Sequence, residues 1–433
     1  MICVSTRGKA PAVSLKEAVL AGIAPDGGLY VPATIERKPD SWWSALRGKS
    51  FQDVAITVAT ELTGDELSRD TIASLVRGAL NFPVRVVELD KGLGVVELFH
   101  GPTFAFKDFG ARTLARLMEV LNDGSQRLTI LVATSGDTGS AVAHAFLGIT
   151  GTRVVVLYPE GQVSDVQEAQ FTTLGGNVTA VAVKGTFDDC QRLAKEAFAD
   201  PQLQSRVRLT SANSISLGRL LPQMFYYAFA ALHYKVQTPL LISVPSGNFG
   251  NLVAGIMAWK MGAPINGFAA PTTINDTVPR YFESGRVEPR PSVPTLANAM
   301  DVGNPSNLER LQWLFDGDLT AMRRLISTQA FTDQDVREAI KTLYDNYSYV
   351  ADPHTAIGYL GTRTQPVTSL ERLESVEPAR MFLATAHPAK FREVVEPVIG
   401  KPVPLPDALA ETLTRDKVVK RIGPTLGELS KLL

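Results

Sequence analysis

Lys107 is the residue of this sequence whose surroundings most favour chemistry. It follows the strand-like run 95–99 and a Gly-Pro turn, and phenylalanines stand at positions 104, 106 and 109. Apolar surroundings disfavour the charged form of an amine and lower its pKa, and a neutral amine can form a Schiff base. The simpler interpretation is a surface lysine at the start of a helix, and this run alone leaves both open.

A glycine-rich turn follows a second strand-like run. It reads Ser-Gly-Asn-Phe-Gly-Asn at 246–251, between the run 240–244 and a helical segment. Glycines let the backbone approach a ligand, and the free amides of a helix N-terminus favour a phosphate. The spacing is not that of a dinucleotide fingerprint, and Trp43 stands where a Walker loop ending in Gly48-Lys49-Ser50 needs its first glycine. A turn without a ligand is the alternative.

A third turn, Thr-Ser-Gly-Asp-Thr-Gly at 134–139, also joins a strand to a helix. Ser135, Gly136 and Thr138 offer hydroxyls and amides that suit a carboxylate or a phosphate. Asp137 does not suit an anion, so it must be turned away, protonated or paired with a cation. An ordinary N-cap explains the same residues without a ligand.

Thr385 and His387 follow the predicted strand 379–384. The Thr385 hydroxyl suits a ring nitrogen, whereas His387 suits either acid–base chemistry or a structural hydrogen bond. His100, His354 and Asp352 carry the same alternatives. No HExxH or CxxC spacing occurs in the sequence, so no metal is implied.

The elements around these turns alternate between short β-branched runs and longer runs of helical period. That alternation predicts an α/β fold with parallel sheets covered by helices, whose ligands bind beyond the carboxyl ends of the strands. We expect a separate helical N-terminal extension over 1–92, a first α/β lobe over 93–234 with the lysine, and a second over 235–433 with the glycine turn. The predicted strands are 95–99, 128–132, 153–157, 178–183, 240–244 and 379–384, with helices at 139–147, 164–174, 190–198, 252–261 and within 306–347.

Composition excludes several classes of function. The 433 residues are 45% hydrophobic, and the net charge of −1 with a pI of about 6.6 offers no basic surface for nucleic acid. Only Cys3 and Cys190 are present, so neither a disulfide framework nor a zinc ribbon is expected. No run approaches the roughly 20 apolar residues of a membrane helix. We expect a soluble cytoplasmic protein, either monomer or homodimer.

The ordered motifs resemble the threonine synthase family of the tryptophan-synthase-β-like group of pyridoxal-phosphate enzymes. Two positions depart from the pattern. Ser216 stands where the family more often has asparagine, and Asp137 stands where the wider group usually has asparagine. The motifs that carry the resemblance lie at 5–8, 26–30, 100–108, 134–139, 211–216 with Arg219, 245–251, 275–279, 352–355 and 385–390.

The resemblance implies two lobes of that type and conversion of O-phospho-L-homoserine and water to L-threonine and phosphate. Lys107 would anchor pyridoxal 5'-phosphate and move protons, while Thr385 would meet the ring nitrogen and Asp137 the ring oxygen. Elimination to 2-oxobutyrate, dehydration of a hydroxyamino acid and non-catalytic phosphate binding are the alternatives. The cofactor phosphate would be bound by Gly247, Asn248, Phe249, Gly250 and Asn251, the substrate carboxylate by Ser135, Gly136 and Thr138, and the substrate phosphate by Asn213, Ser214 and Arg219, with Arg112 as a second candidate.

Overall fold

The computed structural model describes residues 1–122, 127–234, 238–364 and 377–433, which form three sheets and the helices around them. The five-stranded sheet has the order β14-β8-β7-β6-β9, and all its neighbouring strands are parallel. This sheet and its helices are β6 (Leu128–Ala133), β7 (Thr152–Pro159), β8 (Val178–Val183), β9 (Arg208–Ser211), β14 (Val419–Ile422), α6 (Asp137–Phe146), α7 (Asp165–Thr172), α8 (Phe187–Ala199), α9 (Pro201–Arg206) and α20 (Leu426–Ser430).

Strand β6 shows why these segments read as continuous apolar runs. All six of its residues are buried, because a central parallel strand is covered by helices on both faces. In register, Ile130 pairs with Val154 of β7 and with Thr210 of β9. Helix α8 begins at a capping box in which the side chains of Thr186 and Asp189 bond each other's backbone amides.

The six-stranded sheet has the order β12-β11-β10-β13-β5-β4 and is parallel except for β4, which pairs antiparallel with β5. Its strands are β4 (Arg85–Asp90), β5 (Leu93–Glu97), β10 (Leu240–Ser243), β11 (Gly267–Thr272), β12 (Ile326–Ala330) and β13 (Ala379–Ala384). The remaining helices of the body are α5 (Lys107–Leu121), α10 (Leu217–Leu220), α11 (Gln223–Ala231), α12 (Gly250–Lys260), α13 (Thr277–Ser284), η2 (Asn298–Met300), α14 (Leu308–Leu314), α15 (Leu319–Leu325), α16 (Asp333–Tyr347), α17 (Pro353–Gly361), η3 (Pro388–Phe391), α18 (Arg392–Ile399) and α19 (Asp407–Leu413).

The N-terminal segment combines helices with a small antiparallel sheet. Its elements are β1 (Ile2–Ser5), β2 (Val13–Ser14), α1 (Leu15–Ala21), β3 (Tyr30–Pro32), α2 (Asp40–Ser44), α3 (Phe51–Thr63), η1 (Gly64–Glu66) and α4 (Arg69–Ala79). Helix α3 packs on α11, and α4 packs on α5. Apolar side chains of this segment share one continuous core with both larger sheets. The expected division of this segment from the rest as an extension stays a prediction.

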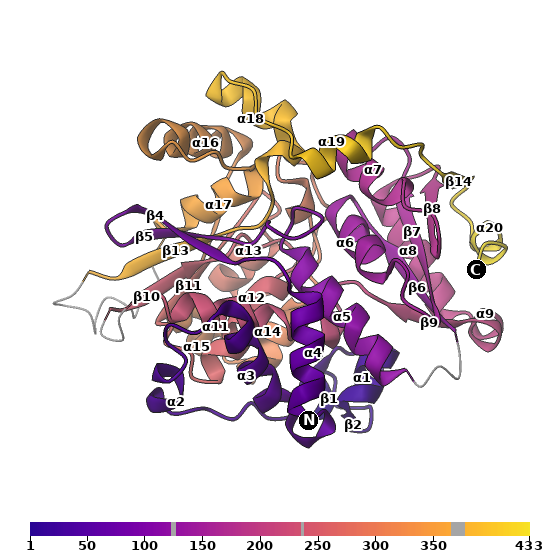
Figure 1. The fold of residues 1–433 in the computed structure, drawn as a ribbon, viewed down its shortest axis with the longest axis horizontal. Coiled ribbons are helices and arrows are strands. Elements are labelled where there is room, and N and C mark those ends of the chain that lie inside the picture. The colour runs from indigo at the N-terminus through magenta and orange to yellow at the C-terminus, as the bar shows by residue number, and fades with distance from the viewer. Residues whose placement is uncertain (123–126, 235–237, 365–376) are drawn as a thin grey trace.

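Figure 1 shows the two larger sheets on opposite sides of the molecule, with α5 and α6 between them. Two loops join across this middle region. The Phe106 amide donates to the Thr385 carbonyl at 2.8 Å, and Ala105 forms an isolated antiparallel bridge with Ala386. The loop after β5 and the turn after β13 are thereby held against each other, next to the start of α5.

The α/β fold with parallel sheets is confirmed, and the strands 178–183 and 379–384 have the predicted bounds. The small N-terminal sheet, β4, β9, β11, β12 and β14 were not predicted, and most of these strands are short or lie in segments of mixed polarity. The predicted lobe boundary at 235 lies outside the described residues, and the division into lobes stays a prediction. Each larger sheet draws on both predicted ranges, since β5 lies in the six-stranded sheet and β14 in the five-stranded sheet.

Candidate active site

A cavity of about 140 Å³ lies beyond the carboxyl ends of strands from both larger sheets. Turns that the sequence separates by more than a hundred residues meet there, as expected for ligand sites of parallel sheets. Eleven predicted site residues line it: Lys107, Asp137, Thr138, Ser214, Arg219, Gly247, Asn248, Phe249, Gly250, Asn251 and Thr385.

Three predicted site residues do not line this cavity: Ser135, Gly136 and Asn213. Gly136 has φ 145°, and a β-carbon there would lie 2.6 Å from the Gln167 side chain, so its glycine is needed for packing. The Asn213 side-chain nitrogen lies 3.5 Å from the Ala133 carbonyl. The predicted ligand roles of these three residues stay predictions.

Lys107 is the first residue of α5, and part of it is accessible from the cavity. Burial of its amine lowers the pKa to about 8, helped by the positive charges of Arg219 and Lys390 and opposed by Asp137. A substantial fraction of such an amine is neutral at slightly alkaline pH, as carbonyl chemistry requires. The surface-lysine alternative does not fit this placement.

Asp137 begins α6 and is paired with a cation of the protein itself. Its Oδ1 lies 2.6 Å from Nζ of Lys390 and accepts a hydrogen bond of 2.8 Å from Gln167. Burial alone would raise the pKa of Asp137, but Lys390, Lys107 and the Gln167 hydrogen bond together hold it well below its usual range. Lys390 lay inside the motif at 385–390, yet nothing in the sequence assigned it a role.

The glycine-rich turn forms a cradle at the start of α12. Phe249 adopts a left-handed conformation with φ 61° as the helix cap. A β-carbon on Gly247 would lie 2.6 Å from Cα of Met300, so only glycine lets the turn pack so closely. The side chain of Asn248 is already used, since it donates to Ser214 Oγ and accepts from the Ser306 amide, both at 2.6 Å. The turn thus presents backbone amides to the cavity.

Asn251 adds a side-chain donor to that cradle. Its Oδ1 accepts hydrogen bonds from Tyr226 at 2.6 Å and Tyr227 at 2.8 Å. Its buried Nδ2 has no hydrogen-bond partner among the described residues. Because a buried amide donor without a partner is costly, this atom indicates a ligand acceptor such as a phosphate oxygen.

Arg219 brings a second positive group to the cavity. It is buried, its Nη1 donates to the Ala212 carbonyl at 2.6 Å, and its Nε has no partner in the described part of the chain. Burial lowers its pKa to about 10, so it stays charged. Gly110 of α5 makes room for it, since a β-carbon there would lie 2.9 Å from the Arg219 Nε.

The second candidate arginine lies elsewhere. Arg112 donates to the carbonyls of Gly78 and Ala79 and to the side chain of Asn81, and it is absent from the cavity lining. Its role is therefore to join α5 to the end of α4.

The histidines separate into structural roles. His387 caps η3 by accepting from the Ala389 amide, and burial lowers its pKa to about 4. His354 lines the cavity, with its Nδ1 2.7 Å from Asp352 and its Nε2 accepting from the Ala299 amide at 3.2 Å. Because Nε2 accepts, the proton lies on Nδ1 and His354 holds η2 against the cavity. His100 pairs with Glu97 at 2.7 Å.

Arg310 is a support of the site that the sequence did not indicate. It is fully buried in α14 and donates to the carbonyls of Tyr30, Ser214 and Ile215. Burial lowers its pKa to about 9. The cation fixes the loop that carries Ser214 to the N-terminal segment, so that segment contributes to the shape of the site.

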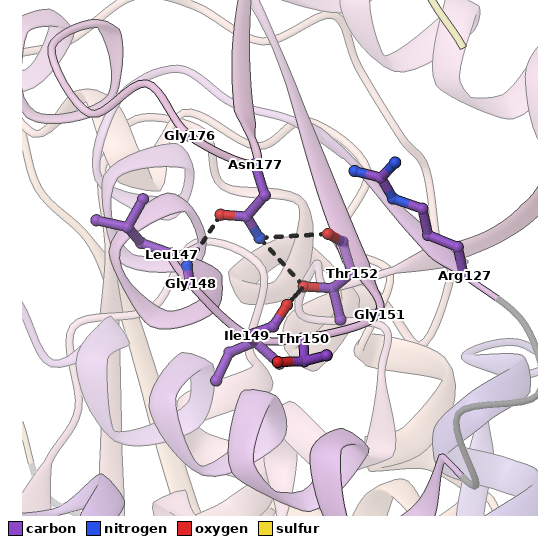
Figure 2. A pocket seen from close by; sticks show the side chains of 9 residues that line it. All are labelled: Arg127, Leu147, Gly148, Ile149, Thr150, Gly151, Thr152, Gly176 and Asn177. Atoms are coloured by element: carbon purple, nitrogen blue, oxygen red, sulfur yellow. Dashed lines mark hydrogen bonds between the residues drawn. The ribbon is translucent and has the colours of Figure 1, made fainter.

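A larger hollow of about 540 Å³ lies at the amino ends of β6 and β7 (Figure 2). Asn177 lies at its centre and already bonds Gly148, the Phe146 carbonyl and Thr152. Only Arg127 among its lining residues is charged. Ligands of parallel sheets bind at the opposite, carboxyl ends, so the smaller cavity is the candidate active site.

Family models match the chain along most of its length. The pyridoxal-phosphate dependent enzyme model matches residues 84–372, the threonine synthase N terminus model 3–80, and the threonine synthase C-terminal model 355–432. The chain is 41% identical to threonine synthase of Serratia marcescens over 97% of its own length and 96% of that protein. The chain belongs to the threonine synthase family.

Solved structures of this family have the same fold. Threonine synthase from Escherichia coli matches with a TM-score of 0.92 and 37% identity, covering 100% of this chain and 99% of that one. The PLP-bound threonine synthase from Brucella melitensis matches with a TM-score of 0.93 and 36% identity, covering 100% and 98%. The expected fold group and the pyridoxal-phosphate-dependent class of enzyme are confirmed.

The residues present fit a pyridoxal phosphate. The amine of Lys107 suits the aldehyde, and the unpaired Nδ2 of Asn251 with the amides of the glycine turn suits the phosphate. Over the described ranges, no group of three His, Cys, Asp or Glu side chains is arranged to hold a metal ion. Nor does any helix in that part of the chain have the length and apolarity to cross a membrane.

Proposed function

We propose that this cavity binds pyridoxal 5'-phosphate and that the protein converts O-phospho-L-homoserine and water to L-threonine and inorganic phosphate. The observation that carries this proposal is one cavity holding the Lys107 amine, the unpaired Asn251 amide and the buried Arg219 guanidinium. The amine suits the cofactor carbonyl, the amide suits the cofactor phosphate, and the guanidinium suits the substrate phosphate. The family to which the chain belongs supports the same reaction.

The cofactor would be held by three elements. Lys107 bonds its carbonyl carbon, the turn from Gly247 to Asn251 binds its phosphate, and Thr385 meets its ring nitrogen. When bound, the pyridine ring supplies an electron sink for the negative charge that develops on the substrate. A hydroxyl such as Thr385, unlike a carboxylate, does not enforce a protonated ring, which restrains side reactions.

Lys107 would also move the protons of the reaction. Once the substrate amine has displaced it, its amine is free to take a proton at Cα and to deliver or accept protons at Cβ. Its pKa of about 8 suits both directions of transfer near neutral pH. Asp137, the carboxylate that lines the same cavity, is held ionised by Lys390.

The substrate carries two anionic groups that need separate partners. Its carboxylate would lie at the start of α6 near Thr138, where the N-cap Gly136 supplies no side-chain hydrogen bond to the helix amides. Its phosphate would be bound by Arg219 with Ser214, because a guanidinium with a free Nε–H can donate two parallel hydrogen bonds to phosphate oxygens. Water must be kept out until phosphate leaves and then be admitted to Cβ, which is the task of a closed cavity.

The experiment is an assay of phosphate and threonine formed from O-phospho-L-homoserine by the purified protein. We expect equal amounts of both products from the native protein and a loss of at least about a thousandfold in Lys107→Ala, since that variant lacks both anchor and base. Lys341→Ala removes an exposed lysine of α16 and should leave the rate unchanged. Borohydride reduction followed by peptide mass analysis should place the cofactor on Lys107.

Other product patterns would contradict the proposal. Phosphate with 2-oxobutyrate in place of threonine would indicate elimination without water addition. Release of neither product, with cofactor still bound, would indicate a binding protein without this activity. The cytoplasmic location, the absence of nucleic-acid partners and the monomeric or homodimeric state stay predictions, which cell fractionation, nucleic-acid binding assays and sedimentation of the native protein test.

A further inference from the structure

We propose that Lys390 is a positioning residue that neutralises Asp137 beside Lys107 and thereby sets the protonation of the lysine nitrogen that carries the cofactor. The inference rests on the proposed function only in that cofactor binds at Lys107. It concerns a residue outside the cavity lining, so it adds a determinant of the reaction beyond the groups that touch the ligand.

The geometry around Lys390 leaves its ammonium group no contact with bulk water. The side chain is fully buried, and Nζ lies 2.6 Å from Asp137 Oδ1 and 2.9 Å from the Thr103 carbonyl. Gln167 supplies a further donor to Asp137 at 2.8 Å. Such an ion pair carries a large desolvation cost and is retained in proteins only with good geometry and additional hydrogen bonds, both of which are present.

Local hydrogen bonds fix Lys390 and the loop that precedes Lys107. Lys390 lies in η3, which His387 caps and which follows the turn bonded to residues 104–106. Thr103, which binds Lys390, is itself held by Asp108 through its amide and its hydroxyl, each at 2.8 Å. The loop that delivers Lys107 and the turn that delivers Lys390 are therefore one connected unit.

The placement of charges determines what Lys390 does. Asp137 interacts electrostatically with both Lys107 and Lys390, so without Lys390 its full negative charge would favour a proton on the Lys107 nitrogen. With Lys390 present, the pair is neutral and the nitrogen gives up its proton more readily. The other charged or titratable groups that interact with Lys107 or Lys390 are Asp108 of α5, His144 of α6, Arg219 of α10 and His387 before η3. Arg112 of α5 acts in turn on Asp108 and His144.

The test is a pH titration of the visible absorbance of the cofactor bound to the native enzyme and to variants. Lys390→Met should raise the pKa of that absorbance change by at least about one unit, because a buried positive charge is lost. Lys390→Arg keeps the charge and should stay within about half a unit of the native value. The exposed-lysine control Lys341→Met should not shift the titration.

A double variant covers the case in which Lys390→Met does not fold. Lys390→Met with Asp137→Asn removes both charges, and replacing a buried ion pair by neutral groups is often tolerated. The absorbance of the double variant should titrate at lower pH than that of Lys390→Met. If Lys390→Met does not fold, the comparison is with Asp137→Asn, and the double variant should titrate at higher pH than this single variant. An unshifted titration in Lys390→Met, or equal values in Asp137→Asn and the double variant, would overturn the inference. Native protein with no cofactor absorbance would overturn the proposed function instead.

Discussion

The hydroxyl of Tyr226 donates a hydrogen bond of 2.6 Å to the side-chain oxygen of Asn251. Tyr227 donates to the same oxygen, and burial raises the pKa of both tyrosines well above 10, so both stay donors. Two donors on the oxygen fix the orientation of the amide and leave its nitrogen for a ligand. The Asn251 amide that would bind the ligand is thus oriented by two tyrosines of α11 that do not themselves line the cavity.

Asn251→Ala should weaken cofactor binding by about ten- to a hundredfold, the cost of one hydrogen bond to a charged phosphate. Tyr226→Phe should weaken it by a smaller factor, because Tyr227 still orients the amide. The measurement is an absorbance titration of cofactor-free protein with pyridoxal 5'-phosphate. Tyr158→Phe is the control, since Tyr158 is a buried tyrosine of β7 whose hydroxyl donates to Glu168 of α7. Equal affinity of Asn251→Ala and native protein would contradict the phosphate role.

Gly247→Ala should weaken cofactor binding by at least about tenfold. The added β-carbon would lie 2.6 Å from the Met300 backbone, so the turn must move away from η2 and its amides leave their positions. Gly78→Ala in α4 is the matched control, since no atom lies within 4 Å of its added carbon. That control should keep cofactor affinity and gain up to about 1 kcal/mol of stability. An unchanged affinity in Gly247→Ala would mean that the turn does not bind the phosphate.

The strand-to-helix turns could be predicted because their chemistry is local. Glycines, hydroxyls and a lysine after buried strands mark ligand sites of parallel sheets wherever they occur, and eleven of the fourteen proposed residues line one cavity. Ser135, Gly136 and Asn213 do not line that cavity, and their ligand roles stay predictions. Residues adjacent in a turn point in different directions, and the direction depends on tertiary neighbours such as Gln167.

The supporting residues could not be predicted, because their roles depend on contacts distant in sequence. Lys390 meets Asp137 across 253 positions, and Arg310 meets Tyr30 across 280. A single charged residue in a helix is typical of a solvated surface, so its burial becomes visible only in the fold. The N-terminal sheet is similar, since β1 pairs with β2 and β3 over strands of two to four residues.

Arg219→Lys should raise the KM for O-phospho-L-homoserine by about ten- to a hundredfold with a smaller effect on kcat. Lysine keeps the charge but loses the planar pair of donors that suits a phosphate. Arg112→Lys is the matched control, because Arg112 lies in α5 outside the cavity and should change KM little. Steady-state kinetics with phosphate detection measures both variants. A normal KM in Arg219→Lys would assign the arginine to structure.

Protein stability should fall as the pH decreases from about 6.5 to 4, in part because of His144. Burial lowers the pKa of His144 to about 4 from its ordinary 6.5, so the folded protein keeps it neutral while the unfolded chain takes up a proton. This contribution is fully present above pH 6.5 and is lost progressively below it, up to about 3 kcal/mol. The free energy of urea unfolding at pH 7 and pH 4.5 measures the effect. In His144→Phe the loss of unfolding free energy between pH 7 and pH 4.5 should be about 2 kcal/mol smaller than in the native protein. An equal loss in the two proteins would show that His144 does not cause it.

Arg310→Met should lower the free energy of unfolding by about 3 kcal/mol, because one buried and two half-buried carbonyls lose a charged donor. It should also raise the KM for O-phospho-L-homoserine, since the Ser214 loop is released from Tyr30 while every residue that lines the cavity is still present. Urea unfolding and steady-state kinetics test the two effects separately. Arg286→Met, an exposed arginine after α13, should change the stability by no more than about 0.5 kcal/mol. A destabilised Arg310→Met with normal KM would show that the N-terminal segment stabilises the fold without shaping the site.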